Sequence, residues 1–226
     1  ETGKSKKTKP KKSLPTPLSI MEKLTPINTP ELPAPRGGCT LVPTPDTNTT
    51  FNLLAGAGRV GQYHDQWDLV LKLPNKQCEW HRLVGQNHEI FGDRSGHSSI
   101  FDPKHSQMII FGGQDFVANK HFDEMYRWDF NEKRWHEVTV AASTEQIEER
   151  NSHAVALDKQ AGVFYVYGGA NRDGPKNDLW RFDLAENEWS RVCVTGVVPD
   201  GREMHTMEFV ELADGKKCLY VLGGRT

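Results

Sequence analysis

The side chains with the clearest potential for chemistry are two carboxylates and an imidazole spaced four residues apart. They occur as Glu89-x-x-x-Asp93-x-x-x-His97, in a chain of 226 residues that contains nine histidines. Such ligands bind Fe(II) while leaving open positions for a substrate. Iron held by Glu89, Asp93 and His97 is therefore the metal hypothesis that the sequence offers, as an alternative to a protein without a metal.

Other catalytic patterns are missing from the sequence. It contains no Gly-x-Ser-x-Gly, no P-loop and no His-Glu-x-x-His, so nucleophilic, nucleotide-binding and zinc-protease chemistry have no support. The four cysteines show no Cys-x-x-Cys spacing, which leaves a zinc site unsupported and favours reduced thiols. We expect no catalytic residue and no cofactor, and hence a protein that is not an enzyme.

Three similar stretches set the organisation of the chain. Four apolar residues followed by two glycines occur at 108–113, 164–169 and 219–224, and the second glycines lie 56 and 55 residues apart. Their β-branched and aromatic side chains predict a buried strand, and glycine suits a sharp turn because it adopts positive φ without a Cβ clash. Recurrence at such a long period is typical of repeat architectures.

Other residues recur in step with these glycines. An arginine and, three residues later, a histidine precede the strands, at Arg94 and His97, Arg150 and His153, and Arg202 and His205. Alternating strands at 123–129 and 177–183 follow, and a strand with a tryptophan ends each of these two units. A weaker unit comes first, in which Cys39 takes the place of the histidine and Gly56-Ala57 the place of the two glycines.

Together, these arginines, histidines, paired glycines and tryptophans resemble the kelch repeat. In that family each repeat is one four-stranded antiparallel blade of a β-propeller, and the resemblance covers residues 36–226. It implies an all-β, kelch-type β-propeller that is incomplete in this chain. The expected blades, about three and a half in number, lie near 36–86, 94–140 and 150–195, with a partial blade at 201–226. Kelch propellers close with more blades, so we expect a longer chain or a second chain to complete the ring.

The resemblance also implies structural roles for the repeated residues. The paired glycines end the second strand of a blade, and the tryptophans pack between neighbouring sheets. The arginines bridge strands or blades through backbone carbonyls, and the histidines lie near the start of the innermost strand. The residues concerned are Arg94, His97, Gly112, Gly113, Trp135, Arg150, His153, Gly168, Gly169, Trp180, Trp189, Arg202, His205, Gly223 and Gly224.

Enzymes with kelch-like propellers keep a catalytic alternative open. The plant specifier proteins of glucosinolate breakdown use a Glu-x-x-x-Asp-x-x-x-His iron motif, but there it follows a Gly-Gly, whereas here it precedes one. Copper-radical oxidases need a tyrosine–cysteine pair and histidines from several blades, a set that this sequence does not assemble. A kelch module of a larger enzyme is the remaining form of this alternative.

Partner binding is the leading functional prediction. Propellers present loops on one rim of a rigid scaffold, and aromatic residues and arginine are favoured interface anchors. The loops after the paired glycines, and their counterpart in the first unit, carry the candidates Arg59, Tyr63, His64, Asp115, Phe116, Asn119, Lys120, His121, Asn171, Arg172, Asp173 and Lys176. We predict a non-enzymatic scaffold or adaptor that binds a protein partner through these loops.

The first 35 residues differ from the rest in composition. Six lysines crowd positions 4–12 and seven prolines lie between positions 10 and 35, so we expect a disordered or extended tail over 1–35. The cluster from Lys4 to Lys12 fits a solvated, solubilising tail, and the alternatives are a nuclear-import signal or a tether to an anionic partner such as nucleic acid. We expect a cytoplasmic or nuclear protein without membrane contact, while the glycosylation sequon Asn48-Thr49-Thr50 keeps a secreted alternative open.

Overall fold

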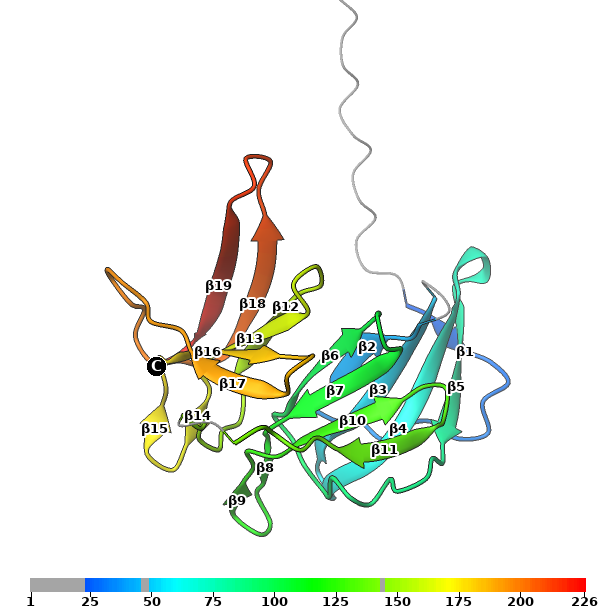
Figure 1. Ribbon diagram of the computed structural model, residues 1–226. Helices are drawn as coiled ribbons and strands as arrows, with labels where there is room; N and C mark the ends of the chain where they lie inside the picture. The colour runs from blue at the N-terminus through cyan, green and yellow to red at the C-terminus, as the bar shows by residue number, and fades with distance from the viewer. Residues whose placement is uncertain (1–22, 46–48, 143–144) are drawn as a thin grey trace, which may run out of the picture.

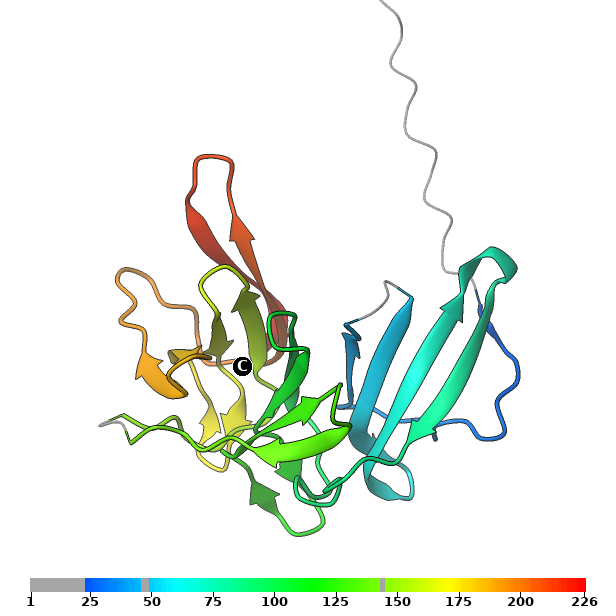
Figure 2. The same ribbon diagram turned by 45° about the vertical axis from the view of Figure 1, so that its right-hand side comes forward.

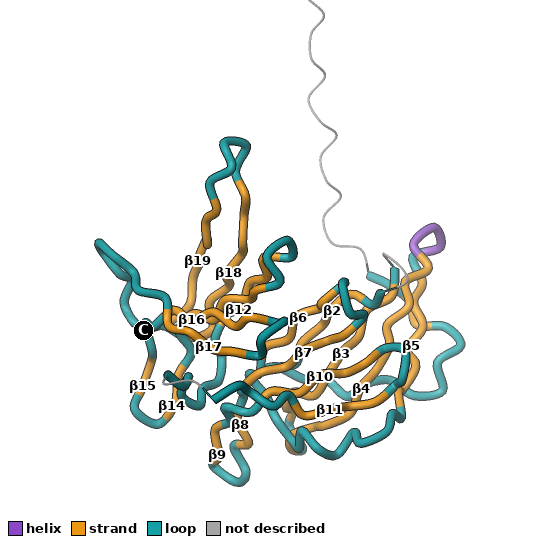
Figure 3. The backbone as a smooth tube through the Cα atoms, in the orientation of Figure 1, coloured by secondary structure: helices purple, strands orange, loops and turns teal. Residues whose placement is uncertain are grey.

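The computed structural model describes residues 23–45, 49–142 and 145–226. The lysine cluster at 4–12 and Asn48 of the sequon lie outside the described residues. β-Strands make up about half of the described residues, with one 3-10 helix at Leu73–Asn75 (Figure 3). None of the described helical segments has the length and apolar character needed to cross a bilayer.

Three antiparallel sheets and a terminal hairpin stand side by side in an arc (Figure 1). The first sheet has the order β1-β5-β4-β3-β2, in which only β1 runs parallel to its neighbour. Its strands are β1 (Thr25–Pro26), β2 (Thr40–Pro43), β3 (Thr50–Gly58), β4 (Gly61–Lys72) and β5 (Gln77–Leu83). Apart from β1, it is the four-stranded blade that the sequence predicts.

The second and third sheets each contain four strands in the order first-second-third-fourth along the chain. The second consists of β6 (Ser98–Asp102), β7 (Gln107–Phe111), β10 (Met125–Asp129) and β11 (Arg134–Glu137). The third consists of β12 (Ala154–Asp158), β13 (Val163–Tyr167), β16 (Leu179–Asp183) and β17 (Glu188–Arg191). The prediction of an all-β fold with four-stranded antiparallel blades is therefore confirmed.

The remaining described strands form three two-stranded hairpins. Two short ones follow the second strand of their blades and are formed by β8 (Gln114–Asp115) with β9 (Lys120–His121) and by β14 (Ala170–Asn171) with β15 (Gly174–Pro175). The third, long hairpin pairs β18 (Glu203–Glu211) with β19 (Lys217–Arg225) and forms the partial fourth blade.

The blades meet along their innermost strands, with β2 beside β6, β6 beside β12, and β12 beside β18. A chain of backbone hydrogen bonds joins them just before these strands. Gly96 donates to the carbonyl of Gly38 at 2.9 Å, Ser152 to Gly96 at 2.7 Å, and Met204 to Ser152 at 2.8 Å. All four residues have positive φ, between 54° and 66°, so the same left-handed turn links each blade to the next.

The cores lie between neighbouring blades. Trp135 is fully buried between the first and second blades, next to Phe91 and Trp128, and Trp189 is buried between the second and third, against Phe111 and Phe164. The first of these interfaces also contains a series of hydrogen bonds between buried polar side chains. In it, the Trp135 indole donates to Gln66, Gln66 donates to Asn52, and Asn52 donates to Asp68. Burial raises the pKa of Asp68.

The predicted tail is packed onto the first blade over its described part. Thr25 and Pro26 form β1, the chain bends at Asn28 and Pro30, and the amides of Thr25 and Ile27 donate to the carbonyls of Lys76 and Cys78 on either side of the start of β5. Further along, the amide of Trp80 donates to Thr29. Figure 2 shows this blue segment on the outer side of the first sheet. The edge of β5 is therefore covered by a strap from the same chain.

The paired glycines need one correction in the first blade and one in the fourth. In the first blade, Ala55 and Gly56, not Gly56 and Ala57, take their places: Ala55 has φ of 51°, and its carbonyl accepts from Arg36 as Gly112 does from Arg94. A Cβ on Gly56 would lie 2.8 Å from the Cβ of Cys39, so the positions are defined by packing. In the fourth blade the paired glycines lie inside β19 and do not end it.

Candidate functional site

Three connections project from the same end of the blades, at the bottom of Figures 1 and 2. They are the tight turn between β3 and β4, the β8–β9 hairpin and the β14–β15 hairpin, and we call them together the rim. Each follows the second strand of its blade directly after the paired glycines or their counterpart. The predicted partner-binding residues all lie on the rim or next to it.

Hydrogen bonds from the second glycine of each pair fix where the rim begins. The amides of Gly56, Gly113 and Gly169 donate to the carbonyl of the next blade's arginine, at 2.9, 2.8 and 2.9 Å. The first glycine lies equally close to the next blade, since a Cβ on Gly112 would come within 2.6 Å of the Arg150 carbonyl. The positive φ and the close approach of the next blade therefore both favour glycine at these positions, although Ala55 occupies the first of them in the first blade.

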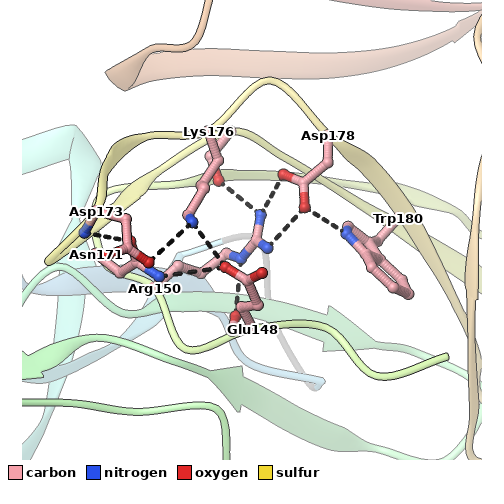
Figure 4. A network of polar contacts seen from close by, with 8 residues as sticks. Glu148, Arg150, Asn171, Asp173, Lys176, Asp178 and Trp180 are labelled. Carbon is pink, nitrogen blue, oxygen red and sulfur yellow. Dashed lines mark hydrogen bonds and ion pairs between the residues drawn. The ribbon is translucent and has the colours of Figure 1, made fainter.

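The repeated arginines hold the base of the rim. Arg150 is fully buried and donates to the carbonyls of Glu148 and Gly168, both at 3.0 Å, and its two terminal nitrogens bind the Asp178 carboxylate at 2.7 and 2.9 Å (Figure 4). Burial alone would raise the pKa of Asp178, but the hydrogen bonds and charge of Arg150 outweigh it and the pKa is lowered. Such a bidentate pair fixes both side chains.

In the second blade the repeated arginine has different partners. Arg94 donates to the carbonyls of Phe91 and Gly112, but its guanidinium stacks over the rings of Phe122 and Tyr126, at 4.3 and 5.2 Å from their centres. Burial lowers the pKa of Arg94 to about 10, although Tyr126 and Glu124 favour the charged form. Aromatic faces thus replace the aspartate that the first and third blades use.

Two of the repeated histidines, His97 and His153, each contact a hydroxyl group of the preceding blade. Nε2 of His97 lies 2.9 Å from Oγ1 of Thr40, and Nε2 of His153 lies 2.7 Å from Oγ of Ser98. Burial lowers the pKa of His97 to about 3, and it lowers the pKa of His153 well below the usual value. Both rings are therefore neutral and structural.

Contacts between neighbouring hairpins make the rim continuous. The Gln62 amide donates to the carbonyl of Gln114 at 2.7 Å, and the amide of Phe116 donates back to Gln62 at 2.8 Å. Arg172, at the tip of β14–β15, donates to the carbonyl of Asn119 at the tip of β8–β9. The three hairpins thus form one surface built from three blades.

The rim exposes three large apolar side chains, with a cation next to one of them. Val60 is 88% exposed, Val117 is 77% exposed and Phe116 is 48% exposed. The hydrogen bond between Phe116 and Gln62 brings the first two hairpins together, so these side chains lie on adjoining tips. Arg59 is exposed next to Val60. Exposed apolar side chains that adjoin on a rigid surface are typical of interaction sites.

Other predicted rim residues are engaged within the protein. Tyr63 lies under the Arg36 guanidinium, at 4.2 Å, and Asp115 accepts hydrogen bonds from the amides of Val117 and Ala118. Lys176 binds Glu148 at 2.7 Å, as Figure 4 shows, and the hydrogen bond and charge of this lysine lower the pKa of Glu148. These residues shape the rim and present little free binding surface.

Three further candidates have side-chain partners of their own. Asn171 donates to Glu148 and accepts from the amide of Asp173, Lys120 binds Glu124 at 3.2 Å, and His64 lies 2.6 Å from Asp93. His121 lies partly buried at the end of β9.

A model of kelch repeats, described as the KLHDC2/KLHL20/DRC7 kelch-repeats domain, matches residues 47–226. The chain belongs to the kelch-repeat family. The match begins inside the first blade and runs through β19, so it covers the rim and the glycine and arginine positions after Leu54. The family predicted from the paired glycines is confirmed.

Several curated proteins are similar over part of their length. The Rab9 effector protein with kelch motifs of Gallus gallus is 29% identical over 65% of this chain and 37% of that protein. Kelch domain-containing protein 2 of Bos taurus is 27% identical over 54% and 33%, and the N-(sulfonatooxy)prop-2-enimidothioate sulfolyase of Thlaspi arvense is 23% identical over 66% and 40%. The chain thus spans less than half of the length of each of these relatives.

The carboxylates and histidine of the metal hypothesis are not brought together. His97 is buried against Thr40 between two blades, Asp93 binds His64, and Glu89 lies at the surface near His88. Among the described residues, no three histidine, cysteine, aspartate or glutamate side chains are grouped closely enough to hold a metal ion. His97 takes the place that the kelch resemblance gave it, as a repeat histidine at the start of the innermost strand.

Three rim residues were missed by sequence reasoning. Val60, Gln62 and Val117 lie within the loops that the paired glycines mark, but they are not among the predicted candidates. The exposed valines give no signal in a single sequence, because isolated apolar residues in loops are common. Gln62 joins two hairpins 52 residues apart, a contact that only the placement of the blades reveals.

Proposed function

We propose that this kelch chain is a non-enzymatic scaffold that binds a protein partner through the rim. The observation that carries the proposal is the adjoining exposure of Val60, Phe116 and Val117 beside Arg59, on hairpins that are bonded to one another. An apolar centre with aromatic and arginine anchors is the composition of protein interfaces.

Two further facts support this proposal. The rim is rigid, because the paired glycines and the buried arginines tie each hairpin to the next blade, so binding would order few side chains. The relative named as a Rab9 effector carries a protein-binding role in its name, and it matches 65% of this chain. Metal-dependent chemistry has no comparable cluster of ligands among the described residues.

Site-specific photo-crosslinking tests the proposal. A photoreactive amino acid replaces Val117 on the rim or, as a control, Val197, which is 99% exposed on the connection after β17. We expect the same protein to be captured at Val117 and not at Val197. With that protein purified, the variant Phe116→Ser/Val117→Asp should raise Kd by about thirtyfold or more, as for hot-spot residues, and Val197→Asp should not. Equal capture at both positions, or unchanged affinity of the rim variant, would refute the proposal.

A further inference from the structure

A cleft of about 260 Å³ lies between the second and third blades, both of which have all four strands. The β6–β7 and β16–β17 turns form part of its wall, and they lie at the end of the strands away from the rim. Most of the side chains inside it are apolar and belong to the core between the two blades. The cleft is lined by Ile109, Met125, Arg127, Val138, Phe182 and Asn187, among others.

Arg127 lines this cleft without a charged partner. Its Nε is buried and has no hydrogen-bond partner, and no carboxylate of the described residues forms an ion pair with it. The two acidic side chains on this side of the blade are engaged elsewhere. Asp102 lies 2.6 Å from Nδ1 of His105, and Asp129 accepts from Gln107 at 3.2 Å. The guanidinium therefore offers free N–H groups to an anion, and carboxylates suit its planar geometry best.

The corresponding position of the first blade is satisfied within the protein. Across the sheet, Arg127 pairs with Ile109, three residues before the paired glycines. In the same register of the first blade, Asp68 pairs with Asn52. The Asn52 amide donates to the Asp68 carboxylate at 2.9 Å, whereas Ile109 has no polar side-chain group to offer. The second interface thus contains an unpaired arginine where the first contains a carboxylate with a partner.

The next blade also contributes differently to the two interfaces. Burial raises the pKa of Asp68, while the hydrogen bond from Asn52 and the charge of Lys133 in the second blade act in the opposite direction. The residue 54 positions after Lys133 is Asn187, and the two have nearly the same φ, 51° and 53°. Asn187 lines the cleft but carries no charge. The first interface thus brings opposite charges together across two blades, and the second leaves the charge of Arg127 uncompensated.

Further positive charge lies beside the cleft. A smaller pocket of about 90 Å³ adjoins it and is lined by Lys159. Within the described part of the chain, neither Lys104 nor Lys159 forms an ion pair. Positive charge therefore exceeds negative charge along the two pockets, which favours an anionic ligand. The residues that line both pockets are Asp102, Lys104, His105, Leu184 and Ala185.

We propose that the cleft binds a small carboxylic acid with an apolar body. The carboxylate accepts hydrogen bonds from the guanidinium of Arg127, and the apolar part packs against Ile109, Met125 and Val138. Ligand pockets usually have volumes of about 300 Å³ or more, so this cleft takes a small ligand. Because the cleft lies away from the rim, the ligand and a protein partner on the rim do not compete for one surface.

Hydrocinnamate, in which a short aliphatic chain joins a phenyl ring to a carboxylate, provides the probe. We expect it to bind the full chain with Kd of about 1 mM or tighter and to shift the NMR amide signals of residues 104–109 and 182–187. Hydrocinnamamide keeps the shape without the charge, and propionate keeps the charge without the ring. Each should bind at least about tenfold more weakly than hydrocinnamate.

Two variants test the role of the arginine. Arg127→Met removes the charge and keeps an apolar side chain of similar length, and it should weaken binding of hydrocinnamate by about tenfold or more. Asn187→Asp leaves Arg127 in place but adds a carboxylate to the cleft. It should weaken binding to a similar extent, because the new carboxylate competes for the guanidinium and repels the ligand.

Matched controls separate the cleft from general loss of charge and from the rim. Arg181 lies 54 positions after Arg127, outside the cleft and 3.8 Å from Asp183, so Arg181→Met should leave binding unchanged. Val117→Asp on the rim should also leave it unchanged. Equal losses in Arg127→Met and Arg181→Met, equal affinity for hydrocinnamate and hydrocinnamamide, or amide shifts confined to the rim would overturn the proposal. So would the absence of saturable binding up to about 10 mM.

Discussion

At the scale of single residues, the buried histidines show how one side chain ties two blades together. His97 and His153 each contact a hydroxyl of the preceding innermost strand, at Thr40 and Ser98. In the third interface, the residue that corresponds to Thr40 and Ser98 is Ala154, which has no hydroxyl. Nε2 of His205 has no hydrogen-bond partner in the described structure. A buried polar atom without a partner costs free energy, so the third interface is weaker than the first two at this point.

This difference predicts a stabilising substitution. Ala154→Ser should place a hydroxyl next to Nε2 of His205 and raise the free energy of unfolding by about 1 kcal/mol. Ala156→Ser, two residues along the same strand and equally buried, has no histidine to meet and should lower it. Chemical denaturation of the two variants checks the prediction. A gain from both substitutions, or from neither, would contradict it.

The same histidines predict how stability depends on pH. The pKa of His97 is lowered to about 3 by burial and the pKa of His153 is also lowered, so the folded chain binds fewer protons than the unfolded chain below about pH 6.5. Their contribution is complete above that pH, and stability should fall as the pH drops toward 3, by up to about 1.4 kcal/mol per pH unit for each histidine.

Urea titrations between pH 7.5 and pH 5 check this dependence. Over that range the aspartates bound to arginine stay ionised, because the pKa values of Asp65 and Asp178 are lowered. The variant His153→Asn should show a smaller slope of stability against pH than the wild type. An unchanged slope would assign the effect to other groups.

At the scale of elements, the paired glycines do more than end a strand. Gly112 and Gly162 have nearly the same φ, 66° and 65°, but only Gly112 faces another blade. Gly162→Ala should therefore lower the free energy of unfolding by about 1–2 kcal/mol, the cost of a left-handed alanine. Gly112→Ala should cost clearly more, because its Cβ would meet the Arg150 carbonyl at 2.6 Å. Equal losses in the two variants, measured by thermal or chemical unfolding, would show that the contact between blades is unimportant.

Most blade strands could be predicted from the sequence, because their residues alternate and their glycines recur. The first blade was the least predictable, since alanine replaces one glycine and cysteine the histidine, and the resulting register was wrong by one residue. Its buried polar chain from Trp135 through Gln66 to Asn52 could not be foreseen, because it joins residues up to 83 positions apart. The two short rim hairpins were expected only as loops.

At the scale of the whole molecule, the sequence predicted the family and the incomplete set of blades but not the surfaces. The candidates on the rim were found by their place after the glycines, and the structure joins them through Gln62 and Arg172. The exposure of the valines on the rim depends on which faces the blades leave uncovered. That is a property of packing in three dimensions, so residue types alone do not reveal it.

The backbone hydrogen bonds between the innermost strands connect the blades in series. Each one joins a blade only to its immediate neighbour, as the bonds from Met204 to Ser152 and from Ser152 to Gly96 do. The strap along β5 secures the first blade, while no strand of the described residues pairs with the outer edge of β19. A force applied at β19 would therefore unfold the blades one at a time, and the first blade would unfold last.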